Sequence, residues 1–121
     1  MVSEIGQNDK EGIPVEDRKV YVLMIYTKYY ALVTEIDFKT GDAFGFIRDS
    51  EETVGKWDKM NLADMMDGDW LTLEFNEPMS FGEAITIGEE YYIETSKMED
   101  QMKAYGEYTN GLQKKVKRIN I

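Results

Sequence analysis

Between residues 18 and 48 the chain consists of three segments rich in Val, Ile, Tyr and Phe, separated only by short polar turns. Two residues separate the segment at 18–26 from the segment at 29–36, and a turn with a late glycine at 37–42 leads into the third, 43–48. These residue types are typical of β-strands, and connections this short join antiparallel neighbours. The sequence therefore predicts a three-stranded antiparallel meander.

Two strands alternate clearly enough for their side chains to be assigned to faces of the sheet. In the second strand we expect Tyr30, Leu32, Thr34 and Ile36 on one face, with Ala31, Val33 and Glu35 on the other. In a later strand, residues 70–75, we expect Leu71, Leu73 and Phe75 on one face, with Trp70, Thr72 and Glu74 on the other.

The rest of the chain adds strands and short helices. Asn61 has the character of a helix N-cap before a short helix that ends at Gly68. Residues 80–90 fit either a helical turn opened by Ser80 or the start of a strand, and both alternatives stay open. The further expected strands are residues 54–60, 91–93 and 113–121, and a second helix is expected at 95–105.

The fold class predicted from these patterns is α+β and mainly β. We expect an antiparallel sheet of five or six strands with one or two short helices packed against one face. Residues 1–16 show neither the helical nor the strand pattern of apolar residues and are expected to form a loose lead-in. Residues 17–121 are expected to form a single globular domain.

The sequence contains no histidine and no cysteine. Their absence removes thiolate nucleophiles, the usual structural zinc sites and the side chain that most often serves as a general base near neutral pH. No phosphate-binding glycine loop is present, and nothing in the spacing pairs a serine with a lysine base. We therefore predict a protein that is not an enzyme and has no cofactor.

Negative charge is concentrated in the middle of the chain. Residues 35–100 carry 18 acidic and 5 basic side chains, whereas residues 101–121 carry 1 acidic and 5 basic ones. Because phosphate backbones are bound by cationic surfaces, direct binding of nucleic acid is not expected. The expected partner is a basic protein surface, such as the surface of a host defence protein that normally holds nucleic acid. Solubility alone also explains an acidic balance.

Four aspartates, Asp58, Asp64, Asp67 and Asp69, form the densest group of carboxylates. Hard cations prefer such oxygen ligands, but the spacing is not that of a calcium loop. Turn and cap chemistry at Asp67 and Asp69 explains the pattern without a metal, and we predict none. These aspartates, together with Glu74, are instead the candidate contacts for a basic partner.

Tyrosine is the most frequent aromatic residue in the chain, with 8 copies. Tyrosine is favoured at protein interfaces because it combines a rigid apolar ring with a polar tip. In strands, however, alternate tyrosines are commonly half-buried residues of the sheet. At the adjacent Tyr91 and Tyr92 at least one ring should lie outside, so both join the candidate binding residues.

Five short motifs lie between residues 32 and 80. They are LVTEID at 32–37, DAFGFI at 42–47, VGKW at 54–57, MNLADM at 60–65 and LEFNEPMS at 73–80. With these motifs the stretch resembles a small family of unknown function found in plasmid and phage proteins. The chain departs from that family by placing Lys56 between the glycine and the aromatic residue and by carrying a longer C-terminal part. The resemblance implies carriage by a mobile genetic element and no particular reaction.

Together these features predict a small, acidic, non-enzymatic phage or plasmid protein that binds a basic host protein. An inhibitor of the anti-CRISPR or anti-restriction type, which imitates the charge of nucleic acid, would act in this way. The alternative is an accessory domain that binds a small ligand or another mobile-element protein through its sheet.

The longest apolar run, residues 20–26, is far shorter than the roughly 20 residues of a membrane helix. The N-terminus lacks the pattern of a signal peptide, so a cytoplasmic location is expected.

Overall fold

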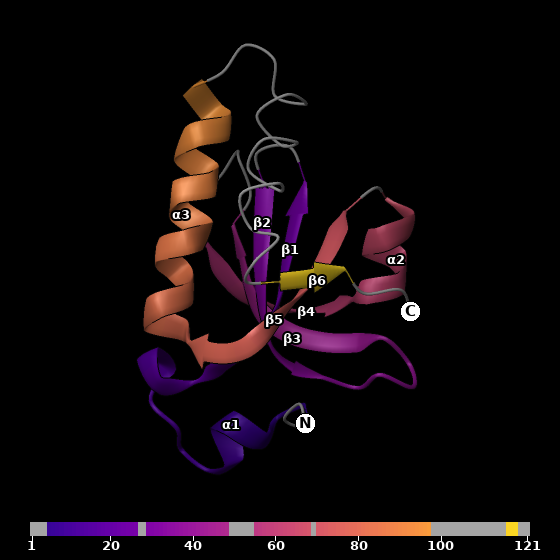
Figure 1. Ribbon diagram of the computed structural model, residues 1–121. Helices are drawn as coiled ribbons and strands as arrows, with labels where there is room; N and C mark the ends of the chain where they lie inside the picture. The colour runs from indigo at the N-terminus through magenta and orange to yellow at the C-terminus, as the bar shows by residue number, and fades with distance from the viewer. Residues whose placement is uncertain (1–4, 27–28, 49–54, 69, 98–115, 119–121) are drawn as a thin grey trace.

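The computed structural model describes residues 5–26, 29–48, 55–68, 70–97 and 116–118. These residues form a six-stranded antiparallel sheet in the order β4-β3-β2-β1-β5-β6, with short helices packed on it (Figure 1). The predicted α+β, mainly β fold is confirmed. The strands are β1 (Lys19–Tyr26), β2 (Tyr29–Ile36), β3 (Asp42–Arg48), β4 (Lys56–Asn61), β5 (Leu71–Ser80) and β6 (Val116–Arg118). The helices are α1 (Gln7–Lys10), η1 (Val15–Asp17), α2 (Leu62–Asp67) and α3 (Phe81–Lys97).

The predicted meander forms the centre of the sheet. β1 pairs with β2 through a two-residue connection, with Tyr26 opposite Tyr29, and β2 pairs in turn with β3. β1 also pairs with β5, so it is covered by a strand on each edge. It is covered on each face as well, because every residue from Val22 to Ile25 is fully buried. This position explains why β1 is a continuous apolar run without alternation.

The core consists of two clusters, one on each side of the sheet. On the side covered by α3, here called the α3 side, Leu23, Leu32 and Leu73 pack beneath Tyr91. On the side that carries α2, the α2 side, Val22 and other small apolar residues pack against Leu62. The helices therefore lie on both faces of the sheet (Figure 1). The expectation that they would share one face is wrong, because a central sheet with two apolar faces needs a cover on each side.

A β-bulge in β2 changes one predicted face. The register of β2 against β3 shifts between Val33 and Glu35, where one extra residue enters β2. Ile36 consequently packs on the α2 side with Val33, not on the α3 side with Leu32. A bulge resets the strict two-residue alternation from which the prediction was made. In the first half of β5 the alternation holds, and Leu71, Leu73 and Phe75 share the α3 side as predicted. Farther along β5 its register against β1 shifts, between Glu74 and Met79.

The predicted N-cap of the short helix is confirmed. The Asn61 side chain accepts a hydrogen bond of 3.0 Å from the backbone N–H of Asp64, and Leu62 begins α2. The helix ends before Gly68, whose backbone N–H bonds back to the carbonyl oxygens of Asp64 and Met65. A Ser/Asn-type cap satisfies an N–H that would otherwise lack a partner, so this local signal was sufficient to place the helix.

The prediction that residues 91–93 are extended is wrong, because they belong to α3. The helix begins after Ser80, whose hydroxyl accepts a hydrogen bond from the backbone N–H of Glu83 and donates one to the Glu83 carboxylate. This capping box settles the open alternative at residues 80–90 in favour of a helix. The expected helix at 95–105 begins inside α3, and its residues 98–105 lie outside the described part. No helix among the described residues is long and apolar enough to cross a membrane.

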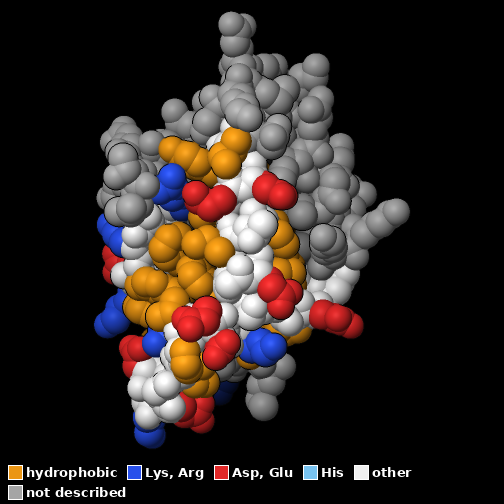
Figure 2. All heavy atoms as spheres, turned by 90° about the vertical axis from the view of Figure 1, so that its left-hand side faces the viewer, with side chains coloured by type: hydrophobic (Ala, Val, Ile, Leu, Met, Phe, Trp, Pro, Cys, Tyr) orange, Lys and Arg blue, Asp and Glu red, His pale blue; other side chains and the backbone are white. Residues whose placement is uncertain are grey.

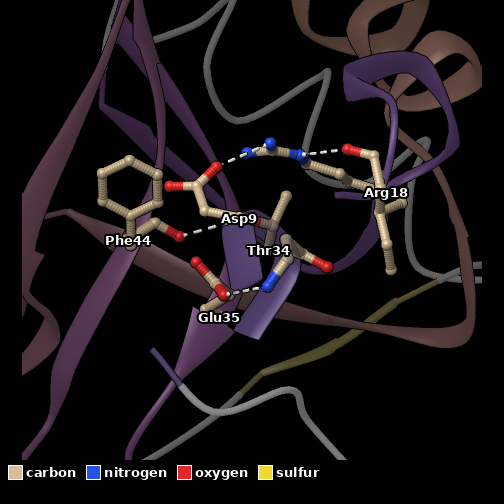
Figure 3. A network of polar contacts seen from close by, with 7 residues as sticks. Asp9, Arg18, Thr34, Glu35 and Phe44 are labelled. Atoms are coloured by element: carbon tan, nitrogen blue, oxygen red, sulfur yellow. Dashed lines mark hydrogen bonds and ion pairs between the residues drawn. The ribbon is translucent and has the colours of Figure 1, made fainter. Parts of the chain in front are cut away.

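The N-terminal segment is fastened to the sheet by polar contacts (Figure 3). The guanidinium of Arg18 pairs with the Asp9 carboxylate at 2.8 Å and donates to the carbonyl oxygen of Ile13 at 3.2 Å. The buried carboxylate of Glu35 accepts a hydrogen bond of 2.9 Å from the backbone N–H of Asn8. Glu35 thus holds α1 against the end of β2, which gives a buried acid a defined partner.

Candidate functional site

Two of the predicted binding carboxylates project from strands on the α2 side. On β4, Trp57 packs into the α3-side cluster and Met60 into the α2-side cluster. Asp58 shares the face of Met60, because side chains alternate along a strand. On β5, Glu74 alternates with the α3-side residue Leu73 and is half-buried. Asp58 and Glu74 therefore share the α2 side of the sheet.

The other predicted residues divide between the two sides. Asp64 and Asp67 are exposed residues of α2 and lie on the same side as Asp58 and Glu74. Tyr91 and Tyr92 lie on α3, on the opposite side. Tyr91 is fully buried and Tyr92 is half-buried, so one ring of the pair reaches the surface as expected. Asp69 lies outside the described residues. Four carboxylates are thus brought onto one side, without the tyrosine pair.

Three aromatic rings that the sequence did not mark as a group stack on the α2 side. The ring centroids of Tyr26, Tyr29 and Trp70 lie 5.9 to 6.1 Å apart, with interplanar angles of 24° to 29°. Each of the three residues is half-buried, so the stack keeps exposed ring area. The signal in the sequence was the position of Tyr26 and Tyr29 on either side of a two-residue turn, with Trp70 on the same face as Glu74.

We call the set formed by the carboxylates and the stacked rings the acidic-aromatic surface. Methionines of β4 and α2 lie half-buried on the same side and pack against the α2-side core. One cation tempers the negative charge of the carboxylates, because Lys56 pairs with Asp58 at 3.9 Å. The surface comprises Asp58, Asp64, Asp67, Glu74, Tyr26, Tyr29 and Trp70.

A second polar cluster lies on the α3 side, between α3 and strands β2 and β3. The Tyr30 hydroxyl donates a hydrogen bond of 2.5 Å to the Glu89 carboxylate, which also lies 3.5 Å from the Arg48 guanidinium. The guanidinium lies 4.5 Å from the centre of the Tyr92 ring. Burial raises the pKa of Tyr30, and the hydrogen bond to Glu89 and its negative charge raise it further. The phenol therefore stays protonated and anchors α3 to the sheet.

This cluster predicts a loss of stability at alkaline pH. The unfolded chain releases the Tyr30 proton above the ordinary tyrosine pKa of about 10, whereas the folded chain keeps it. Unfolding then releases a proton, so the free energy of unfolding falls as the pH rises above 10, by up to about 1.4 kcal/mol per pH unit. Urea denaturation between pH 8 and pH 11 measures this slope. Tyr30→Phe should lack the part of this pH dependence that comes from Tyr30. If the free energy of unfolding fell equally steeply with pH in the two proteins, the raised pKa of Tyr30 would be contradicted.

The other polar groups and recesses of the described residues lie away from these two clusters. Among the described residues, no group of three or more carboxylates could hold a metal ion. Ser80 and Glu83 are adjacent, but their contacts are those of the capping box of α3. An open recess of about 480 Å³ lies along the second half of β5. It is lined by Lys19, Asn76, Glu77, Pro78, Met79, Ser80 and Glu83.

The comparisons with known proteins give no relative. No protein-family model matches the chain, and it matches neither a curated protein nor a solved structure. The resemblance of residues 32–80 to mobile-element proteins stays a prediction. The arrangement of side chains on the α2 side is therefore the basis for a functional assignment.

Proposed function

We propose that this protein is a non-enzymatic binding protein that holds a basic protein surface against the α2 side of its sheet. The observation that carries the proposal is the placement of four carboxylates and three stacked rings on that one side. Carboxylates pair with lysine and arginine, and the exposed faces of tyrosine and tryptophan attract the same cations through their π-electrons. An arginine-rich surface would satisfy both kinds of group together.

The charge of the whole chain supports the same conclusion. A formal net charge of −10 produces a field that steers a basic partner towards the protein and repels nucleic acid. A partner surface that normally binds nucleic acid would carry the required cations. With the resemblance to plasmid and phage proteins, this favours an inhibitor of a nucleic-acid-binding host defence protein.

The proposal is tested by reversing the two exposed carboxylates of α2, with Asp64→Lys and Asp67→Lys in one variant. The matched control carries Glu16→Lys and Glu90→Lys, which change the net charge equally at exposed positions of η1 and α3. Each protein is immobilised and incubated with host lysate, and the retained proteins are identified by mass spectrometry.

We expect the wild-type protein and the control to retain the same basic protein, and the α2 variant to lose it. Thermal melting of all three proteins shows whether each variant is folded. Retention by the α2 variant would contradict the proposed surface. Loss from both variants would mean that overall charge, and not the α2 side, governs the interaction.

A further inference from the structure

β4 forms one edge of the sheet. Among the described residues it pairs with β3 alone, so its second row of backbone N–H and C=O groups faces outward. Such an edge can pair with a strand of another chain, and charged side chains on an edge strand commonly serve to prevent this. The sequence of β4, Lys56–Asn61, carries both signs of charge, at Lys56, Asp58 and Lys59. The order of these charges along β4 decides whether they prevent or favour pairing with a strand of another chain.

A symmetric pair of β4 strands has few possible registers. A two-fold axis perpendicular to the sheet makes the two β4 strands antiparallel. It also places the α2 sides of both copies on the same face of the combined sheet. Only residues of the same face can then stand opposite each other, so one residue must face its own copy. Centring the pair on Lys56, Asp58 or Lys59 sets two like charges directly opposite, which is unfavourable.

Centring the pair on Trp57 gives a different result. Lys56 of each copy then stands opposite Asp58 of the other, which creates two ion pairs on the α2 side. Within one chain these side chains already lie 3.9 Å apart, and each is more than half exposed. The pairing would therefore produce a square of four alternating charges. Exposed ion pairs contribute little energy individually, but among registers centred on a residue of β4 this is the one that sets opposite charges of the strand opposite each other.

The opposite side of β4 supplies apolar contact in the same register. Trp57 is half-buried, and its ring centroid lies 5.0 Å from that of Phe81 and 5.9 to 6.0 Å from those of Phe46 and Phe44. Figure 2 shows the α3 side, where hydrophobic side chains gather with acidic and basic side chains around them. Across the two-fold axis each Trp57 would face its own copy, and aromatic cross-strand pairs are among the most favourable in sheets.

We propose that two copies of this chain associate through their β4 edges, with Trp57 on the two-fold axis and reciprocal Lys56–Asp58 ion pairs. The partner of this edge is thus a second copy of the chain. The resulting sheet is continuous through both copies. The acidic-aromatic surfaces of the two copies lie on the same side of it, so the dimer presents two binding surfaces in one plane.

Sedimentation velocity of the purified protein tests this dimer, over concentrations up to about 1 mM, where even weak specific association is visible. We expect the wild-type protein to dimerise with rising concentration. Lys56→Glu and Asp58→Lys should each be monomeric, because each sets like charges opposite in the homodimer. Mixing the two variants should restore a dimer, since each then supplies the charges that the other requires.

Matched controls separate this contact from general charge effects. Lys39→Glu and Asp17→Lys make the same charge changes at exposed positions outside β4 and outside the acidic-aromatic surface, and should dimerise as the wild type does. Circular dichroism establishes that the single variants are folded. A wild-type protein that stays monomeric at about 1 mM, single variants that still dimerise, or a mixture that stays monomeric would each overturn the proposal.

Discussion

Replacing Tyr91 by alanine is expected to lower the free energy of unfolding by about 3–5 kcal/mol. Tyr91 is fully buried and belongs to the core cluster that joins α3 to β1, β2 and β5. Truncation leaves a cavity between helix and sheet, where the surrounding side chains are held by the strands and cannot fill the space. Urea denaturation followed by circular dichroism measures the loss.

The control for this prediction is two residues away on the same helix. Ile93 is 47% exposed, and Ile93→Ala should change the free energy of unfolding by less than about 1 kcal/mol. The contrast tests the helical assignment itself, because a strand would place Tyr91 and Ile93 on one face, whereas the helix places them on different faces. Equal losses in the two variants would contradict the placement of α3.

A second large loss of stability is expected for Gly45→Ala in β3. A Cβ atom at Gly45 would collide with the backbone carbonyl of Leu32, next to the bulge in β2. A rotamer change cannot relieve a contact with backbone, so the strands must separate. We expect a cost of about 3 kcal/mol, at the upper end for overpacking.

Gly82→Ala is the matched control for Gly45→Ala. Gly82 is exposed in the first turn of α3, where an added Cβ would lie 3.6 Å from the nearest atom, the carbonyl oxygen of Glu16. Alanine is favoured over glycine in a helix, so this change should raise the free energy of unfolding by up to about 1 kcal/mol. Chemical denaturation measures the free energy of unfolding of both variants. A Gly45→Ala protein as stable as the wild type would mean that β2 and β3 do not approach as closely as described.

Most of the sheet could be predicted because its signals are local. Residue type, the spacing of turns and the Asn61 cap define β1 to β4 and α2 without reference to the rest of the chain. The boundaries of β2, Tyr29–Ile36, agree with the sequence prediction. The bulge after Val33 could not be predicted, because it depends on how two strands fit together and leaves no mark in either strand alone.

Helix α3 was predicted only in part, for the opposite reason. Glycine and β-branched or aromatic residues, including Gly88 and Ile93, lower its intrinsic helix propensity. What stabilises the helix is the row of Phe81, Ala84 and Tyr91, which meets the sheet at helical spacing. At Gly88, within this row, an added Cβ would collide with the Tyr30 ring, so glycine permits close packing. Tertiary contact therefore overrides local preference in α3.

The candidate site was predictable in part. Composition indicated the carboxylates, but only the alternation of β4 and β5 around the two cores places Asp58 and Glu74 on the same side as α2. The stack of Tyr26, Tyr29 and Trp70 depends on β1 lying between β2 and β5, which is a property of the topology. The two predicted tyrosines of α3 were assigned to the site by residue type alone, and the fold places them on the other side.

The most direct test of the proposed function is the affinity of the captured partner for the two double variants, measured by isothermal titration calorimetry. Two reversed charges inside the contact should weaken binding by about 100-fold, equivalent to about 2.7 kcal/mol, because they face cations of the partner. The variant with Glu16→Lys and Glu90→Lys should bind within about 3-fold of the wild type, since rim or distant charges act mainly on association rates. Equal weakening in the two variants, or none in the Asp64→Lys and Asp67→Lys protein, would contradict the assignment of the α2 side as the binding surface.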